Sequence, residues 1–444
     1  MKVTRLPKDS GPAGWDAILP PRQPNPELRE SLTSEWLVIG AGFAGLAAAR
    51  RLSQLHPSDR ITVLEAARIA EGPAGRNSGF MIDLPHDLAS EDYGGNLEDD
   101  RKQTRLNRAG ISFALDAANQ YGLSDEAIVK SGKINAAATA KGMKHNTAYG
   151  THLEKLDEVH EMLDATQMRE LTGTNYYQGG LFTPHAAMIQ PALFVRGVAQ
   201  GLLSNRVAIH ERSPVIELKH RGQDWIAKTP GGDVTAGRVI LAVNGHAESF
   251  GFFPRQLIHV FTYASMTRAL NDEEVRTLGG AARWAVTPAD PLGTTVRRIC
   301  GTGGHRIIVR NRFTCNPSME ISERQIADCG RNHDRAFRHR FPMLSGVAAE
   351  YRWGGRLCLS RNSAPAFGEL QPGLFAACCQ NGLGTAKGTV SGMLAADLAS
   401  GIASPLLDDM LSQPSPTRLP PEPIAYLGAS ATIRWGEFKA GAEL

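Results

Sequence analysis

The stretch WLVIGAGFAGLAAARRL, residues 36–52, decides the fold of this chain. Its apolar opening predicts a buried parallel strand, and its alanine-rich end predicts a helix. Between them Gly40, Gly42 and Gly45 form a G-x-G-x-x-G turn. The first glycine allows a tight turn, the second lets the backbone approach a diphosphate, and the third lets helix and strand pack closely. The N–H groups at the helix start then attract the phosphates of a dinucleotide.

A second strand, RITVLEA at residues 60–66, follows the predicted helix and strengthens this interpretation. Glu65 lies 20 residues after Gly45, where an acidic side chain meets the ribose hydroxyls of a dinucleotide. The candidate cofactor contacts in this unit are Gly40, Gly42, Phe43, Ala44, Gly45, Glu65 and Ala66. The motif alone does not distinguish NAD from FAD.

Composition indicates a globular protein of two or three domains. The chain has 444 residues, a net charge of +3 and six cysteines with neither zinc spacing nor a dense disulfide pattern. This charge balance gives no reason to expect a nucleic-acid partner. Residues 1–33 are rich in proline and polar groups and predict an extended arm without the apolar core of a signal peptide. We expect a cytoplasmic protein without a membrane span.

Later segments predict further parts of a cofactor domain. A loop of small residues, GPAGRNSGF at residues 72–80, suits a flat ring system. Residues 181–203 turn into an amphipathic helix, and short strands then form a meander that ends in Asn244 and Gly245. A buried strand, a glycine-rich turn at residues 381–385 and a helix of small residues would place a second helix N-terminus against the cofactor.

With these motifs, residues 34–401 resemble the FAD-dependent D-amino-acid oxidase and glycine/sarcosine oxidase superfamily. The carriers are the glycine fingerprint with Glu65 and the segments GRNSGF, IQPALFVRGVA, VILAVNGH and GLGTAKG. The stretch YRWGGRLCLSRNSAPAFGEL, residues 351–370, is similar to the γ-glutamylputrescine oxidase branch. The resemblance implies FAD as the cofactor, with further contacts from Arg76, Asn77, Ser78, Gly79, Val215, Asn244, Gly245, Gly355, Asn381, Gly382, Leu383, Gly384 and Thr385.

The resemblance also implies an α/β fold with a discontinuous chain path. A Rossmann-like FAD-binding domain would combine with an α+β substrate domain built on a large mixed sheet. The FAD-binding domain would take residues 34–95, 180–255 and 350–405, and the substrate domain residues 96–179 and 256–349, between an arm at 1–33 and a tail at 406–444.

The reaction that the resemblance implies is oxidation of a C–N bond in a small amine or amino acid. Hydride would pass from the α-carbon to flavin N5, and water would hydrolyse the imine product. The turn that contains Gly384 would stabilise negative charge on the flavin. Lys387 stands where similar sarcosine oxidases hold the substrate carboxylate, or else is a solvent-facing lysine at a helix start. His305, with His86 and His185, is a candidate for the pocket or a structural histidine.

Several points stay open at this level. The electron acceptor is either O2 or an electron-transfer partner. With a partner as acceptor, the chain would be a dehydrogenase subunit. The resemblance to the γ-glutamylputrescine oxidase branch favours O2. Cys358 lies close to the position that forms a thioether link to the flavin in sarcosine oxidases, although non-covalent FAD is favoured. Arginines that could meet an acidic group on the substrate are Arg268, Arg283, Arg297 and Arg310.

Overall fold

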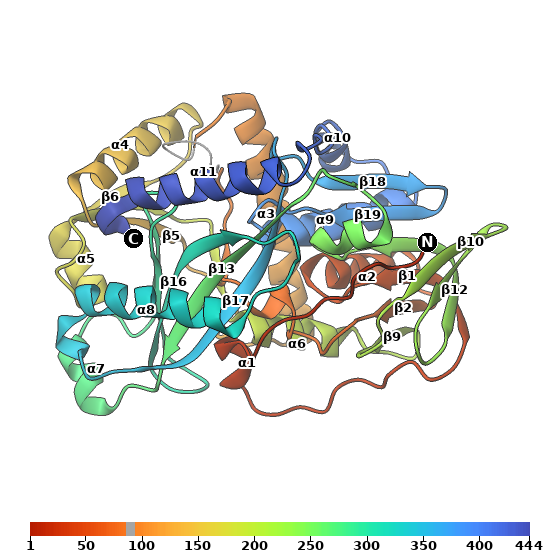
Figure 1. Cartoon of the computed structure of the whole chain (residues 1–444), viewed down its shortest axis with the longest axis horizontal. Helices are drawn as coiled ribbons and strands as arrows, with labels where there is room; N and C mark the ends of the chain where they lie inside the picture. The colour runs from red at the N-terminus through yellow and green to blue at the C-terminus, as the bar shows by residue number, and fades with distance from the viewer. Residues whose placement is uncertain (86–93) are drawn as a thin grey trace.

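The computed structural model describes residues 1–85 and 94–444, and its core is two large sheets that lie side by side. Figure 1 shows the first sheet and its helices on the right and the second sheet on the left. Both sheets draw strands from distant parts of the chain, so the α/β fold with a large mixed second sheet is confirmed.

The first sheet contains the predicted glycine turn. Its central strands run parallel in the order β19, β12, β1, β2, β9, and the β10–β11 and β18–β19 hairpins extend it. Its strands are β1 (Leu32–Ile39), β2 (Ile61–Leu64), β9 (Val207–His210), β10 (Glu217–Arg221), β11 (Asp224–Lys228), β12 (Asp233–Leu241), β18 (Ala366–Gln371) and β19 (Leu374–Cys378). The apolar run from Trp36 to Ile39 is buried on both faces, as predicted for a central parallel strand.

Small residues let the helices of this unit pack closely. Helix α2 (Phe43–Leu55) crosses α9 (Ala386–Ala399) where Gly392 faces Ala44. A Cβ atom on Gly392 would lie 1.9 Å from the Ala44 carbonyl oxygen, so only glycine fits there. Helices α3 (Leu97–Tyr121) and α6 (Pro191–Leu202) pack against the same pair, and α10 (Pro405–Leu411) packs against α9 and α3.

The second sheet is mixed and has the order β17, β13, β16, β15, β14, β5, β7, β6. Its strands are β5 (Lys133–Ala137), β6 (Glu161–Asp164), β7 (Gly179–Thr183), β13 (Ile258–Thr267), β14 (Trp284–Pro288), β15 (Thr295–Ile299), β16 (Arg306–Cys315) and β17 (Ala349–Leu359). A small third sheet joins β3 (Phe80–Met81), β8 (Ala187–Ile189) and β4 (Ile128–Lys130). Strands β7 and β17 thus lie in the second sheet, although the predicted boundaries gave residues 180–183 and 350–359 to the FAD-binding domain.

Helices also cover the second sheet. Helices α8 (Glu323–Arg340) and α11 (Ile424–Ala440) both contact β16, and Figure 1 shows them across the front of the molecule. The remaining helices of this part are α4 (Ala140–Lys155), α5 (Ala165–Thr172) and α7 (Asp272–Leu278), while the short α1 (Gly14–Ala17) lies in the N-terminal arm. Within the two described ranges, no helix combines the length and the apolar character needed to cross a bilayer.

Candidate functional site

The glycine turn forms a cradle at the start of α2. Gly40 has a φ of +102°, and a Cβ atom there would lie 2.6 Å from the carbonyl oxygen of Ala242. A Cβ atom on Gly45 would lie 1.8 Å from the Gly40 carbonyl oxygen, which is the close helix–strand contact expected of the third glycine. No side chain caps α2, so the N-terminus of the helix offers main-chain N–H groups to an anion.

Glu65 follows β2 directly and lies beside this cradle. Its carboxylate accepts hydrogen bonds from the Ala41 N–H at 2.8 Å and the Ala67 N–H at 3.0 Å. Burial raises the pKa of the Glu65 carboxyl above its ordinary value, although the two N–H groups favour the charged form. A half-buried carboxylate that is fixed at the end of the second parallel strand and lines the cavity is suited to accept hydrogen bonds from ribose hydroxyls.

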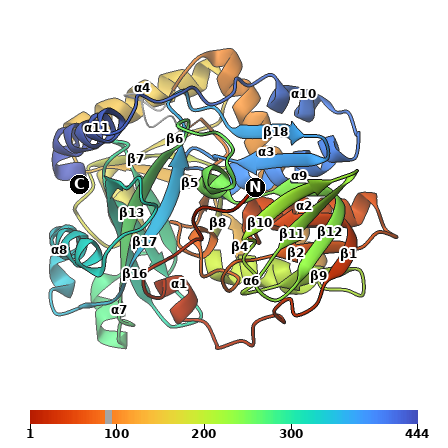
Figure 2. The same cartoon turned by 45° about the vertical axis from the view of Figure 1, so that its right-hand side comes forward.

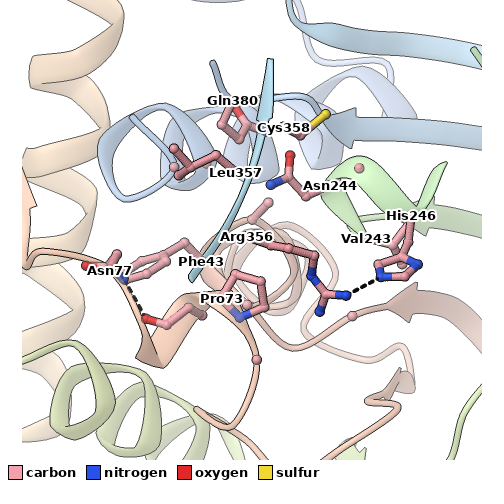
Figure 3. A pocket seen from close by; sticks show the side chains of 18 of the residues that line it. Phe43, Pro73, Asn77, Val243, Asn244, His246, Arg356, Leu357, Cys358 and Gln380 are labelled. Carbon is pink, nitrogen blue, oxygen red and sulfur yellow. Dashed lines mark hydrogen bonds between the residues drawn. The ribbon is translucent and has the colours of Figure 1, made fainter. Parts of the chain in front are cut away.

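One long cavity runs from this cradle to the second sheet (Figure 3). Most of the predicted cofactor contacts line it. They are Gly40, Gly42, Phe43, Ala44, Glu65, Ala66, Asn77, Ser78, Val215, Asn244, Gly245, Asn381, Gly382, Leu383, Gly384 and Thr385. A cavity with a diphosphate cradle at one end and a second helix N-terminus along its wall fits an extended dinucleotide such as FAD.

The turn before α9 is held in place by its own side chains. The Asn381 amide donates to the carbonyl oxygens of Ser363 and Ala364 at 2.9 and 3.0 Å, and its oxygen accepts from the Ser360 N–H at 2.8 Å. The Thr385 hydroxyl donates to the Phe80 carbonyl oxygen at 2.5 Å. The uncapped N-terminus of α9 therefore meets the cavity as a rigid, electropositive edge.

Four predicted cofactor contacts do not line the cavity and support it from behind. Gly45 packs against Gly40 and Val38, and Gly355 packs against the Arg76 backbone. Gly79 has a φ of +78° and leaves no room for a side chain beside the Ile189 carbonyl. The buried Arg76 side chain donates to the carbonyl oxygens of Glu71, Ser10, Gly11 and Gly354, so it ties the N-terminal arm to β17.

Two of the three predicted catalytic residues also lie outside the cavity wall. Lys387 is the second residue of α9, whereas Gly384 lines the cavity. His305 lies in the turn between β15 and β16, with its Nε2 atom 3.5 Å from the Cys300 sulfur. His185 does not line the cavity either, and His86 lies outside the described residues.

The N-terminal arm forms a wall of the cavity that sequence reasoning missed. Asp9 of the arm pairs with Arg356 of β17 at 2.8 Å, and each side chain is only 7 % exposed. His246 Nε2 lies 2.9 Å from Arg356 Nη1, as Figure 3 shows, and burial lowers the pKa of His246 to about 3. The imidazole is therefore neutral near pH 7 and accepts this hydrogen bond, so the arm is tied to β17 through a buried charge network.

Another wall of the cavity is formed by residues of the second sheet and the loop beside it. Thr287, Pro291, Thr295 and Arg310 line the cavity there, and Arg310 on β16 lies across from Thr295 on β15. The Arg310 guanidinium also lies over the Phe313 ring, 4.7 Å from its centroid.

The other three candidate arginines have different roles. The buried Arg297 donates to the carbonyl oxygens of Ser78, Gly79 and Ile189, Arg268 pairs with Glu274, and Arg283 is exposed. Of the four arginines considered for an acidic substrate group, only Arg310 lines the cavity.

The comparison with protein families agrees with this geometry. Residues 35–398 match the family described as FAD dependent oxidoreductase. The chain belongs to this family. It is 24 % identical over 369 residues to the probable oxidoreductase OrdL of Haemophilus influenzae, with 81 % of each chain covered. It is also 24 % identical over 354 residues to γ-glutamylputrescine oxidoreductase of Escherichia coli, with 78 % of this chain and 79 % of that protein covered.

Solved structures of two enzymes share the fold. Glycine oxidase from Geobacillus kaustophilus superposes with a TM-score of 0.70 at 18 % identity, over 88 % of this chain and all of that one. L-proline dehydrogenase from P. horikoshii gives a TM-score of 0.65 at 17 % identity, over 86 % of this chain and 96 % of that one. The family assignment makes this chain an FAD-dependent oxidoreductase, as its sequence motifs predicted.

Proposed function

We propose that this enzyme oxidises a C–N bond of a small amine or amino acid and passes the electrons to O2. The observation that carries the proposal is the cavity in which the dinucleotide cradle meets a second-sheet wall that carries Arg310. The relatives named as γ-glutamylputrescine oxidoreductase and glycine oxidase support an amine or amino acid as the substrate class. FAD, when bound, supplies the hydride acceptor for the substrate carbon.

The residues of the first unit would hold and polarise the cofactor. The cradle from Gly40 to Ala44 would bind the diphosphate through main-chain N–H groups, and Glu65 would accept hydrogen bonds from the ribose. The α9 N-terminus, from Asn381 to Thr385, would stabilise negative charge on the flavin ring without a charged side chain.

We propose Arg310 as the residue that meets an acidic group of the substrate. Arg356 also lines the cavity, where its guanidinium joins Asp9 of the arm and His246 in the wall beside the cradle. Arg310 projects from the second sheet beside threonine hydroxyls, where a carboxylate would find both charge and hydrogen-bond donors. Lys387 has no place in this proposal, because it does not line the cavity.

We further propose that FAD is held without a covalent bond. Cys358 lines the cavity, but burial and the neighbouring Cys379 thiol raise the pKa of the Cys358 thiol well above its ordinary value. The thiolate is the nucleophile in thiol chemistry, so this environment disfavours attack on the flavin. Acid precipitation should leave a colourless protein pellet and a yellow supernatant.

Two structural units divide these tasks in the proposal. The parallel sheet with α2, α9 and Glu65 would be the FAD-binding domain, and the mixed sheet with Arg310 would be the substrate domain. For this division β7 and β17 count with the mixed sheet, and α3, which packs against α9 and α6, counts with the parallel sheet.

The test is anaerobic reduction of the bound flavin by a panel of primary and secondary amines, with and without a carboxylate. We expect loss of the yellow absorbance with at least one amine, and Arg310→Met should weaken binding of the carboxylate-bearing amine by about 10- to 150-fold, the equivalent of one charged hydrogen bond. Arg283→Met, an exposed arginine, is the matched control. Hydrogen peroxide in a one-to-one ratio to oxidised amine would support O2 as the acceptor.

Two outcomes would contradict the proposal. Purified protein that neither contains nor takes up FAD would overturn the whole assignment. Reduction by the amine with no reoxidation in air would instead favour the alternative of a dehydrogenase subunit that passes electrons to a partner.

A further inference from the structure

Helix α11 carries an apolar stripe that faces solvent. Four large side chains form it, and their exposed fractions are 61 % for Ile424, 60 % for Leu427, 60 % for Trp435 and 77 % for Phe438. Among all large hydrophobic side chains of the described residues, only Val159 is comparably exposed. A contiguous exposed apolar patch on a globular protein marks an interaction surface.

The stripe lies opposite the face by which α11 packs on the protein. The inner face uses small residues and Glu437, which pairs with Arg312 at 2.7 Å and accepts from the Phe313 N–H at 2.9 Å. Gly436 rests against Leu292, where a Cβ atom would lie only 2.2 Å from a Leu292 methyl carbon. Figure 2 shows α11 at the edge of the molecule, so its outer face is accessible.

The spacing of the stripe is that of a helix-pairing seam. Ile424, Leu427, Ala431, Trp435 and Phe438 follow one another at intervals of 3, 4, 4 and 3 residues, so all five lie along one face of the helix. A narrow apolar seam of this kind packs against another helix, whose side chains fit between its own.

The seam is also symmetric about Ala431. Ile424 and Phe438 lie seven residues on either side of it, and Leu427 and Trp435 lie four residues on either side. In an antiparallel pair of identical helices, the two-fold axis would therefore pass beside Ala431, where a small side chain allows close approach. Each Ile424 would face Phe438 of the partner subunit, and each Leu427 would face Trp435 of the partner subunit.

We propose that the outer face of α11 is a homodimer interface, with a second copy of this chain bound across the two-fold axis at Ala431. The five seam residues themselves are uncharged, and the Lys439 ammonium lies over the Trp435 ring at the edge of the seam, 5.9 Å from its centroid. The four large side chains expose roughly 500 Å² per subunit in total, against about 800 Å² per partner in a standard interface. The dimer is therefore concentration-dependent, with Leu427 and Trp435 next to the axis and Phe438 at the ends of the interface.

The experiment measures the sedimentation of the FAD-loaded enzyme between 1 and 100 µM. We expect the monomer–dimer equilibrium to fall in this range, and Leu427→Glu or Trp435→Glu to raise the dissociation constant at least 100-fold. Both residues are exposed, so each variant should fold, which the flavin absorbance of the purified protein checks. Val159→Glu is the matched control, since it changes an equally exposed apolar residue far from α11 in sequence and should leave dimerisation unchanged.

A cross-linking experiment tests the symmetry itself. Ala431→Cys places two thiols at the axis, so copper-phenanthroline should oxidise them to a disulfide-linked dimer, whereas Tyr426→Cys, outside the seam, should cross-link far less. A wild-type protein that stays monomeric at 100 µM, equal cross-linking of both cysteine variants, or an equal effect of Val159→Glu would overturn the proposal. In that case the stripe would serve another surface, such as a lipid bilayer.

Discussion

Replacement of Glu65 by glutamine tests the proposed dinucleotide site most directly. The two carboxylate oxygens each accept one main-chain N–H, from Ala41 and from Ala67. A glutamine side chain has one oxygen and one NH2 group, so in either orientation one of these N–H groups faces another donor. The amide also offers the ribose a neutral acceptor where the wild type offers a charged one.

The magnitude follows from these hydrogen bonds. A hydrogen bond to a charged group contributes about 1.5–3 kcal/mol, so loss of the ribose contact should weaken FAD binding by about 10- to 150-fold. The free energy of unfolding of the apoprotein should change less. Burial already disfavours the charge on Glu65, and the neutral amide removes that cost while one N–H group loses its acceptor.

The assay is a fluorescence titration of apoprotein with FAD, with Glu71→Gln as the control. Glu71 lies in the same loop and is exposed, and its carboxylate accepts only the Arg68 N–H in the structure, at 3.1 Å. Glu71→Gln should bind FAD like the wild type. A Glu65→Gln variant whose FAD dissociation constant lies within threefold of the wild-type value would refute the assignment of Glu65 to the ribose.

Three further predictions use the same structure. Asp9→Asn should speed FAD release about tenfold in stopped-flow fluorescence, because it weakens the buried Asp9–Arg356 ion pair in the cavity wall. Lys8→Gln removes the exposed Lys8–Glu320 pair instead, and an equal effect of that variant would contradict this reasoning. Burial lowers the pKa of His246 to about 3 in the fold, and it lowers the pKa of His333 to about 3 as well, so the unfolded chain takes up these two protons first and stability falls as pH drops below 6.5. In urea unfolding each histidine should contribute a loss of about 1 kcal/mol between pH 6.5 and 5.5, and His246→Asn should remove about half of the total. Gly392→Ala should lower the free energy of unfolding by about 1–3 kcal/mol or more in urea, because its Cβ atom would meet the backbone of α2. Gly346 has open space around it, so Gly346→Ala should leave the free energy of unfolding nearly unchanged.

The sequence predicted the parts of the site that a short stretch of chain determines. The turn from Gly40 to Gly45 and the acid at Glu65 are local features, since strand, turn, helix and strand follow each other within 30 residues and fix one another. The turn before α9 is local in the same way. Apart from Gly45, these residues line the cavity.

Residues whose position depends on distant parts of the chain could not be placed in this way. Arg76 belongs to the GRNSGF motif of the predicted cofactor loop. Its side chain turns toward the arm and β17, because three of its four carbonyl partners lie at Ser10, Gly11 and Gly354. The contact between Asp9 and Arg356 joins residues 347 positions apart, and no periodicity or spacing reports it. In the sequence Asp9 is one polar residue of a proline-rich arm, and nothing there indicates that its side chain is buried.

The cavity has a consequence for biosynthesis, because its walls come from both ends of the chain. Residue 3 of the arm and residue 388 of α9 line the same space. When a ribosome has synthesised only the first 300 residues, the glycine cradle is present, but the N-terminus of α9 and β17 are still missing. FAD would therefore bind after these later segments have been made, and a shortage of riboflavin would leave full-length chains with an unfilled cavity.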